Sequence, residues 1–94
     1  MRAESMGQKR SEQVILFSDV EKTLQELIHA QEDRLFSLGK RFVPHLTKED
    51  LLQPNDFDEL EHNPHFRYEE GVLSGLLTVQ MAFLAMRKER LNSF

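Results

Sequence analysis

The sequence predicts an all-α fold: a long antiparallel helical hairpin with a short helical connector, which dimerises into a four-helix bundle. Three observations predict it. Apolar residues recur at three- and four-residue steps over two long stretches. Proline and asparagine residues interrupt this pattern between the two stretches. The second stretch is apolar around more of its circumference than one neighbouring helix can cover, which indicates a second partner.

Residues 11–42 are predicted to form the first helix. At about 100° per residue, its apolar residues and one glutamine fall on a single stripe: Phe17, Val20, Leu24, Leu27, Ile28, Gln31, Leu35, Leu38 and Phe42. The apolar run of residues 14–17, which begins with the β-branched Val14 and Ile15, leaves a short strand open. Residues 18–21 could cap a later helix start. We favour the earlier start, because a lone strand would have no partner. The polar residues 1–10 are expected to be a flexible N-terminus before one hairpin domain, residues 11–94.

The connector, residues 43–63, is predicted to be ordered. Gly39 could end the first helix, and Pro44 prevents its extension. Residues 47–52 and 56–60 resemble short capped helical turns, which suits a segment too long to be a structureless loop in a compact domain. The second helix is predicted over residues 64–91, with Asn63 as its N-cap and Pro64 at its first position.

The second helix carries the predicted interface. Large residues at helical spacing are expected to pack against the first helix, and a neighbouring row of small residues would let a second copy of the chain approach closely. We predict the interface at Gly71, Val72, Gly75, Leu76, Thr78, Val79, Ala82, Phe83, Ala85 and Met86. The alternative is that the small residues are ordinary surface and that the glycines mark a kink.

Length and composition support self-association. A chain of 94 residues forms one domain, and a lone two-helix core of this size is marginally stable. The chain has no cysteine, which excludes disulfides and thiolate metal sites and suits a reducing compartment. Its apolar-rich stretch, residues 72–86, is shorter than the ~20 residues of a membrane span. The net charge of −4 argues against nucleic acid as a partner. We therefore expect a soluble cytoplasmic protein.

Two groups of residues are candidate metal sites. In the first, His62 and His65 could bind a divalent metal through imidazole nitrogens, together with Glu61. His45 is left open as a further ligand. The second group, Glu26-x-x-His29, resembles the motif of ferritin-like di-iron proteins, which would imply a further carboxylate at Glu69 or Glu70. However, helical geometry places Glu26 and His29 on the solvent side, and a di-iron site needs them inward.

Enzymatic function is not expected. The order of long helix, short middle element and second helix resembles the all-helical chorismate mutases, a likeness that would imply a dimer with inward-facing arginines. Residues 11–32 contain no arginine, which leaves Arg34 as the one counterpart. No serine belongs to a recognisable nucleophile motif. We predict no catalytic residues and no cofactor, and expect a homodimeric protein-protein interaction module such as an adaptor, small chaperone or assembly subunit. A small metal-binding or di-iron protein is the alternative.

Overall fold

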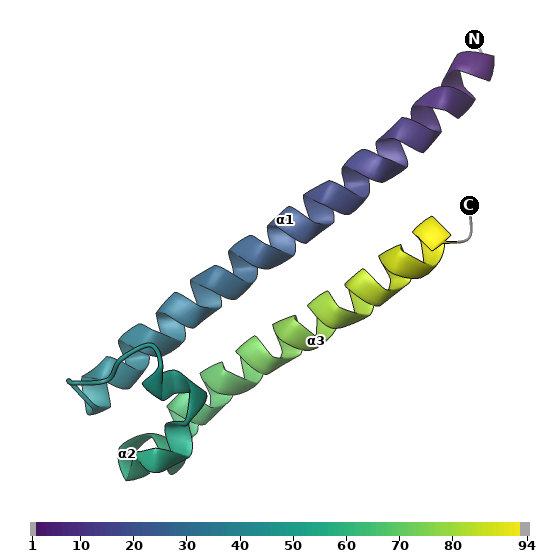
Figure 1. Ribbon diagram of the computed structural model, residues 1–94. Coiled ribbons are helices and arrows are strands. Elements are labelled where there is room, and N and C mark those ends of the chain that lie inside the picture. Colours follow the sequence, from purple (N-terminus) through teal and green to yellow (C-terminus); the bar gives the residue numbers. More distant parts are fainter. Residues whose placement is uncertain (1, 93–94) are drawn as a thin grey trace.

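The computed structural model of the chain is an elongated helical hairpin measuring 62 × 22 × 20 Å. It describes the backbone of residues 2–92 and the side chains of residues 16–91. Two long helices, α1 (Arg2–Phe42) and α3 (Pro64–Asn92), run antiparallel and are joined by three short turns (Figure 1). These turns are the 3-10 helices η1 (Asp50–Leu52) and η2 (Pro54–Asp56) and the short helix α2 (Asp58–Glu61). The predicted all-α hairpin is confirmed.

Helix α1 starts earlier than predicted. It begins at Arg2 rather than near Ser11. The reason is local, because the segment of residues 2–10 holds no proline and is rich in alanine, glutamate, glutamine, lysine and arginine, which favour helix. Residues 14–17, where a strand is the alternative, are also helical. The end of the helix at Phe42 is as predicted.

Side-chain caps order the connector and the start of α3. The Thr47 backbone N–H donates to Asp50 Oδ2 (2.9 Å), and the Asp50 N–H donates to Thr47 Oγ1 (3.2 Å), which forms a reciprocal cap before η1. Asn63 Oδ1 accepts a hydrogen bond from the Phe66 N–H (2.9 Å). This bond confirms Asn63 as the N-cap of α3, with Pro64 at the first helical position.

The hydrophobic core lies at the connector end of the hairpin. It combines both long helices with the connector and consists of Leu35, Leu38, Val43, Leu46, Leu60 and Phe66. Gly39 lies inside α1 rather than at its end. A Cβ there would lie 2.5 Å from Leu46 Cδ2 and 3.4 Å from Phe66 Cε2. The glycine allows the close approach of the connector to the helix, and the helix continues past it to the predicted end at Phe42.

Arg67 ties the connector to the first turn of α3. Its Nε donates to the Glu61 backbone carbonyl (2.9 Å), its Nη1 donates to Glu70 Oε1 (2.7 Å), and its Nη2 donates to Asn55 Oδ1. One guanidinium therefore holds η2, the end of α2 and α3 together, using the fixed fork of donors that distinguishes arginine from lysine. The connector is an ordered part of the fold, as the sequence predicts.

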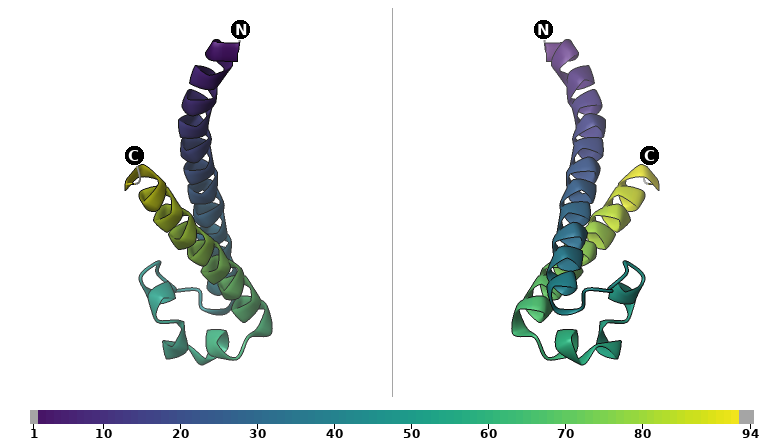
Figure 2. Two further views of the ribbon diagram at one scale, coloured as in Figure 1. Left: turned by 90° about the vertical axis from the view of Figure 1, so that its right-hand side faces the viewer. Right: turned by 90° about the vertical axis from the view of Figure 1, so that its left-hand side faces the viewer.

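The two long helices separate towards their free ends. Figure 2 shows α1 and α3 meeting at the connector end and diverging from there, with the start of α1 reaching beyond the end of α3. Far from the connector they still touch, through the rings of Phe17 and Phe83, whose centroids are 5.7 Å apart, and through an ion pair between Arg87 and Glu21. No helix within residues 2–92 is long and apolar enough to cross a membrane.

Candidate interaction surface

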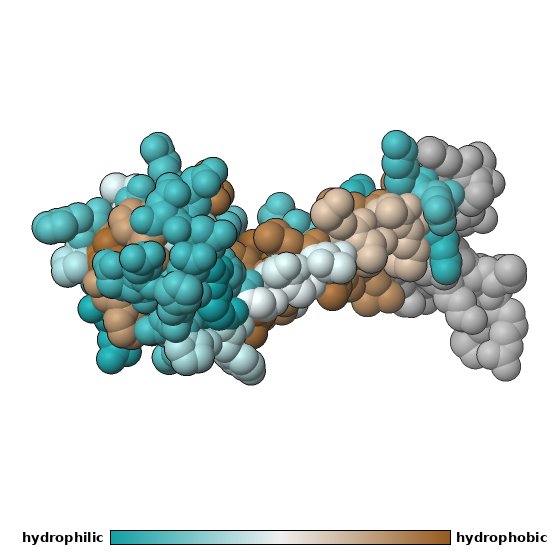
Figure 3. All heavy atoms as spheres, turned by 90° about the horizontal axis from the view of Figure 1, so that it is seen from below, coloured by the Kyte–Doolittle hydropathy of each residue, from teal (hydrophilic) through white to brown (hydrophobic). Residues whose placement is uncertain are grey.

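We refer to α1 up to His29 and α3 from Gly71 onward as the arms of the hairpin. Along the arms Leu24 and Ile28 are buried, but much of the other apolar surface is exposed. Large hydrophobic side chains stay exposed on both helices, although the arms are the part of the chain richest in them. They are Leu16, Val20, Leu27, Val72, Leu77, Val79, Met81, Leu84, Met86 and Leu91. Figure 3 shows the corresponding contrast between a largely hydrophilic connector end and hydrophobic surface along the arms.

The side of α3 that faces α1 differs from the one expected. The half-buried residues of α3 along the arms are Leu73, Leu76, Gln80, Phe83 and Arg87. The contact therefore runs between two stripes of α3 rather than along one of them. The two large stripes are Val72, Leu76, Val79, Phe83 and Met86 on one side, and Leu73, Leu77, Gln80, Leu84 and Leu91 on the other. The prediction that large residues of the interface set pack against α1 holds for Leu76 and Phe83. It is wrong for Val72, Val79 and Met86, which are exposed.

The exposed apolar residues of the two arms share one face of the hairpin. On α1, Leu16, Val20 and Leu27 lie about 60–100° to one side of the line that faces α3. On α3, Val72, Val79 and Met86 lie at about the same angle, in the same rotational sense, from the line that faces α1. In antiparallel helices, equal rotation brings two flanks to the same side of the pair. We call this surface the arm face; it consists of Leu16, Val20, Leu27, Val72, Gly75, Val79, Ala82 and Met86.

The row of small residues predicted to admit a second chain is open in the single hairpin. Gly71, Gly75, Thr78, Ala82 and Ala85 are all exposed. A Cβ built on Gly71 or Gly75 would meet no atom within 4 Å. Gly75 and Ala82 belong to the arm face, whereas Gly71, Thr78 and Ala85 lie further round α3, on the side away from α1. Nothing in the hairpin itself therefore requires glycine at positions 71 and 75.

A buried polar pair marks the boundary between the core and the arms. Gln31 Nε2 donates to the Glu69 backbone carbonyl (2.9 Å) and to Glu69 Oε2 (2.6 Å), and both residues are buried. Arg34 Nη1 lies 4.0 Å from Glu69 Oε1. The sequence places Gln31 on the apolar stripe but does not identify this partner. The signal was available, because Glu69 lies four and seven residues before Leu73 and Leu76 and so shares their side of α3.

The arginine expected by analogy with the mutases does not point into the hairpin. The Arg34 side chain is 69% exposed. It lines a shallow cavity of about 320 Å³ on the same side of the hairpin as the arm face, nearer the connector, together with Arg41, His65 and Glu69. This arrangement lacks the several inward arginines that the resemblance would imply, and Arg34 is adjacent to a carboxylate of its own chain.

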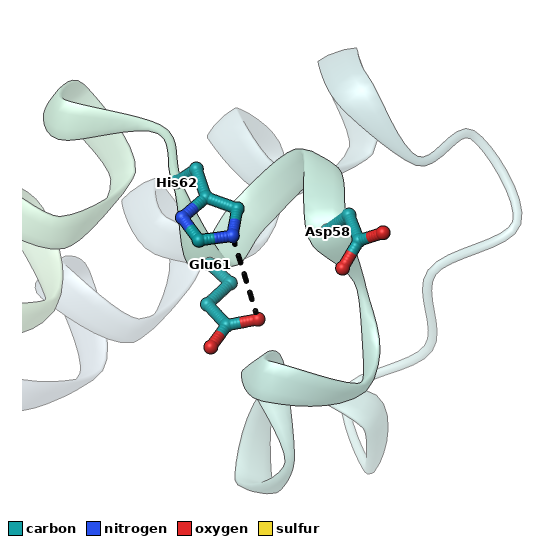
Figure 4. Close-up of side chains that lie close together, drawn as sticks. All are labelled: Asp58, Glu61 and His62. Atoms are coloured by element: carbon teal, nitrogen blue, oxygen red, sulfur yellow. Dashed lines mark ion pairs between the residues drawn. The ribbon is translucent and has the colours of Figure 1, made fainter.

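The histidines considered as metal ligands do not converge. His62 lies with Asp58 and Glu61, and one potential ligand atom from each falls within 4.8 Å of the others (Figure 4). His62 Nε2 is 3.9 Å from Glu61 Oε2. His65 lies instead beside the cavity at Arg34, and His45 is exposed outside the cluster. Asp58 is the ligand candidate that the sequence reasoning missed; it stands three and four residues before the other two and shares their side of one helical turn.

The di-iron arrangement is not formed within the hairpin. Glu26 and His29 are both exposed, as their predicted position on α1 requires. The candidate carboxylates diverge from them, since Glu69 is buried against Gln31 and Glu70 is paired with Arg67. Comparison with known proteins adds no assignment: no family model, curated protein or solved structure matches the chain.

Proposed function

We propose that the chain is a non-enzymatic protein-protein interaction module that acts as a homodimer, in which two arm faces pack together to form a four-helix bundle. The observation that carries this proposal is the exposure of large hydrophobic residues from both arms on one face of a small hairpin. Contiguous exposed apolar surface of this kind is uncommon on monomers and is typical of interaction sites. Adaptor, small chaperone and assembly subunit are the roles that such a module fits.

The second copy is the partner with the best physical support. An isolated pair of helices of this length buries too little apolar surface for robust stability, and the arms have no other element to cover them. Two hairpins packed face to face would bury both arm faces at once, as in other four-helix bundles built from paired hairpins. A twofold arrangement is also the commonest way for identical chains to associate.

Sedimentation equilibrium at low micromolar concentration tests this proposal. We expect the wild-type protein to sediment as a dimer and Ala82→Arg to sediment as a monomer, because the long charged side chain would stand on the arm face where the partner packs. Met81→Arg is the matched control: it changes the preceding residue, which is 71% exposed and outside the arm face. A folded monomeric wild type, or a dimeric Ala82→Arg variant, would overturn the proposal.

A small metal-binding protein is the second candidate, favoured by the clustering of Asp58, Glu61 and His62. Carboxylate and imidazole ligands from one helical turn suit zinc and similar divalent ions. Elemental analysis of protein purified without a histidine tag tests this candidate. It predicts stoichiometric metal in the wild type and its loss in His62→Ala, with His45→Ala as the control. Absence of stoichiometric metal from the wild-type protein would eliminate it.

A further inference from the structure

A groove lies on the side of the hairpin opposite the arm face, between α1, η1 and α3. It has a volume of about 500 Å³, within the usual range for binding pockets. Its apolar lining comes from all three elements and consists of Leu35, Phe36, Leu51, Leu52 and Leu73. Polar residues line the remainder, on α1 and at the start of the connector: His29, Glu32, Asp33 and Lys48. We call it the connector groove.

The floor of the connector groove is held in place by the core, whereas its edge is open. Phe36, Leu51 and Leu73 are partly buried and pack against the core cluster. Leu52 directly follows Leu51 in η1 but is 80% exposed. The groove is thus formed within the single chain, and the exposed Leu52 lies at its edge. Because this apolar site is preformed, ligand binding requires little reorganisation of the protein.

The apolar surface continues from the groove along α3. Leu77 and Leu84 follow Leu73 at steps of four and seven residues, which keeps them on the same side of the helix, and both are exposed. The line from Leu73 to Leu84 spans about 16 Å at 1.5 Å per residue. A compact small molecule would fill only the groove, whereas a helix with apolar residues at matching intervals would cover the whole line.

The charged rim of the groove favours a basic partner. Lys48 Nζ lies 3.9 Å from Asp33 Oδ1, but Glu32 has no ion-pair partner among the described side chains, residues 16–91. The Phe36 ring does not add to this preference, because Lys40 Nζ and Lys48 Nζ of the same chain already lie 5.2 and 5.8 Å from its centroid. A basic side chain entering with the helix could pair with Glu32.

We propose that the connector groove and the adjoining Leu77 and Leu84 bind an amphipathic helix of a partner protein, with bulky aliphatic side chains in the groove and basic residues beside Glu32. This surface is separate from the arm face, on the other side of the hairpin. The bound assembly would therefore present a partner helix on each outer side of the proposed homodimer. Binding does not depend on dimerisation, which allows the two proposals to be tested independently.

Two labelled peptides of about four helical turns, or 14 residues, provide the test. Both carry leucine at the first, fifth and twelfth positions, the spacing of Leu73, Leu77 and Leu84, and they differ in having lysine or glutamate beside these leucines. Fluorescence anisotropy should show saturable binding of the lysine peptide and much weaker binding of the glutamate peptide. Leu52→Asp should weaken binding of the lysine peptide by roughly tenfold, without loss of helix by circular dichroism, because the side chain is exposed. Glu32→Lys should weaken it severalfold and improve binding of the glutamate peptide.

Val79→Asp is the matched control, since Val79 lies on the arm face. It should abolish dimerisation and leave peptide binding unchanged, whereas Leu52→Asp should do the reverse. Absence of saturable binding by the wild type would overturn the proposal, as would equal binding by Leu52→Asp. Loss of the dimer in Leu52→Asp would show that a second copy occupies the groove, which also overturns it. Loss of peptide binding in Val79→Asp would place the peptide on the arm face instead.

Discussion

The connector end and the arms of the hairpin use similar apolar residues in different ways. At the connector end, six hydrophobic side chains from α1, the connector and α3 are buried together, and Phe66 and Leu60 have no exposed surface. Along the arms, Val79 is 53% exposed although it lies on α3, the same helix as the buried Phe66. The difference arises because three elements surround the core, whereas each arm has one neighbour. Burial is set by the number of packing partners, and the arms have too few in the single chain.

Phe66→Ala should have the largest effect, because it removes a fully buried ring from the connector end. The loss of burial together with the remaining cavity should lower the free energy of unfolding by about 3–5 kcal/mol. Urea denaturation followed by circular dichroism measures this. Tyr68→Ala, two residues along the same helix and exposed, should change the value by less than about 0.5 kcal/mol. Similar losses in both variants would mean that the connector end is not the source of stability.

Gln31→Ala tests the boundary between the two regions. It removes the donor that satisfies the buried Glu69 carboxylate, and an unsatisfied buried polar group should cost about 1–3 kcal/mol of unfolding free energy. Thermal and urea unfolding measure the loss. Gln25→Ala, an exposed glutamine of the same helix, is the control and should be nearly neutral. If the two variants are equally stable, the Gln31–Glu69 pair does not hold the helices together.

Glycine substitutions should give small effects of opposite sign in the two regions. Gly39→Ala places a Cβ against Leu46 at the connector end and should destabilise the hairpin by about 1 kcal/mol, even after the gain in helix propensity. Gly75→Ala meets open space and should stabilise the monomer by up to about 1 kcal/mol.

Urea unfolding at submicromolar concentration, where a dimer would dissociate, measures both glycine effects. The Gly75→Ala gain should diminish or reverse at concentrations where the dimer forms, because the added methyl would stand where the second backbone approaches. A gain that is independent of concentration would show that no chain packs closely against this position.

Sequence periodicity and caps were sufficient to predict the elements, because both are local. The start of α3 is set by Asn63 and Pro64, and its length follows from the apolar spacing. The start of α1 was predicted nine residues late, since the reasoning followed the apolar stripe and gave too little weight to the helix propensity of a polar segment. The role of Gly39 could not be assigned from the sequence for a related reason, because a glycine in close tertiary contact looks the same in the sequence as one that ends a helix.

The candidate surface was only partly predictable. The spacing on α3 correctly shows that one neighbour cannot cover all of its apolar surface, but not which side faces α1. That side runs through Leu76 and Gln80, between the two large stripes, and the choice depends on how Glu69 meets Gln31 and how the helices cross. The connector groove was not foreseen, because Phe36, Leu52 and Leu73 are far apart in the chain and meet only when the connector folds back.

The sequence by itself determined that this chain is a helical hairpin with an ordered connector and with more apolar surface than a single pair of helices can bury. Tertiary structure alone decided where that surface lies: a core at one end, an arm face on one side and a groove on the other. The physical reason is that helix formation and capping depend on neighbours along the chain. The exposure of a side chain depends instead on which distant elements pack around it.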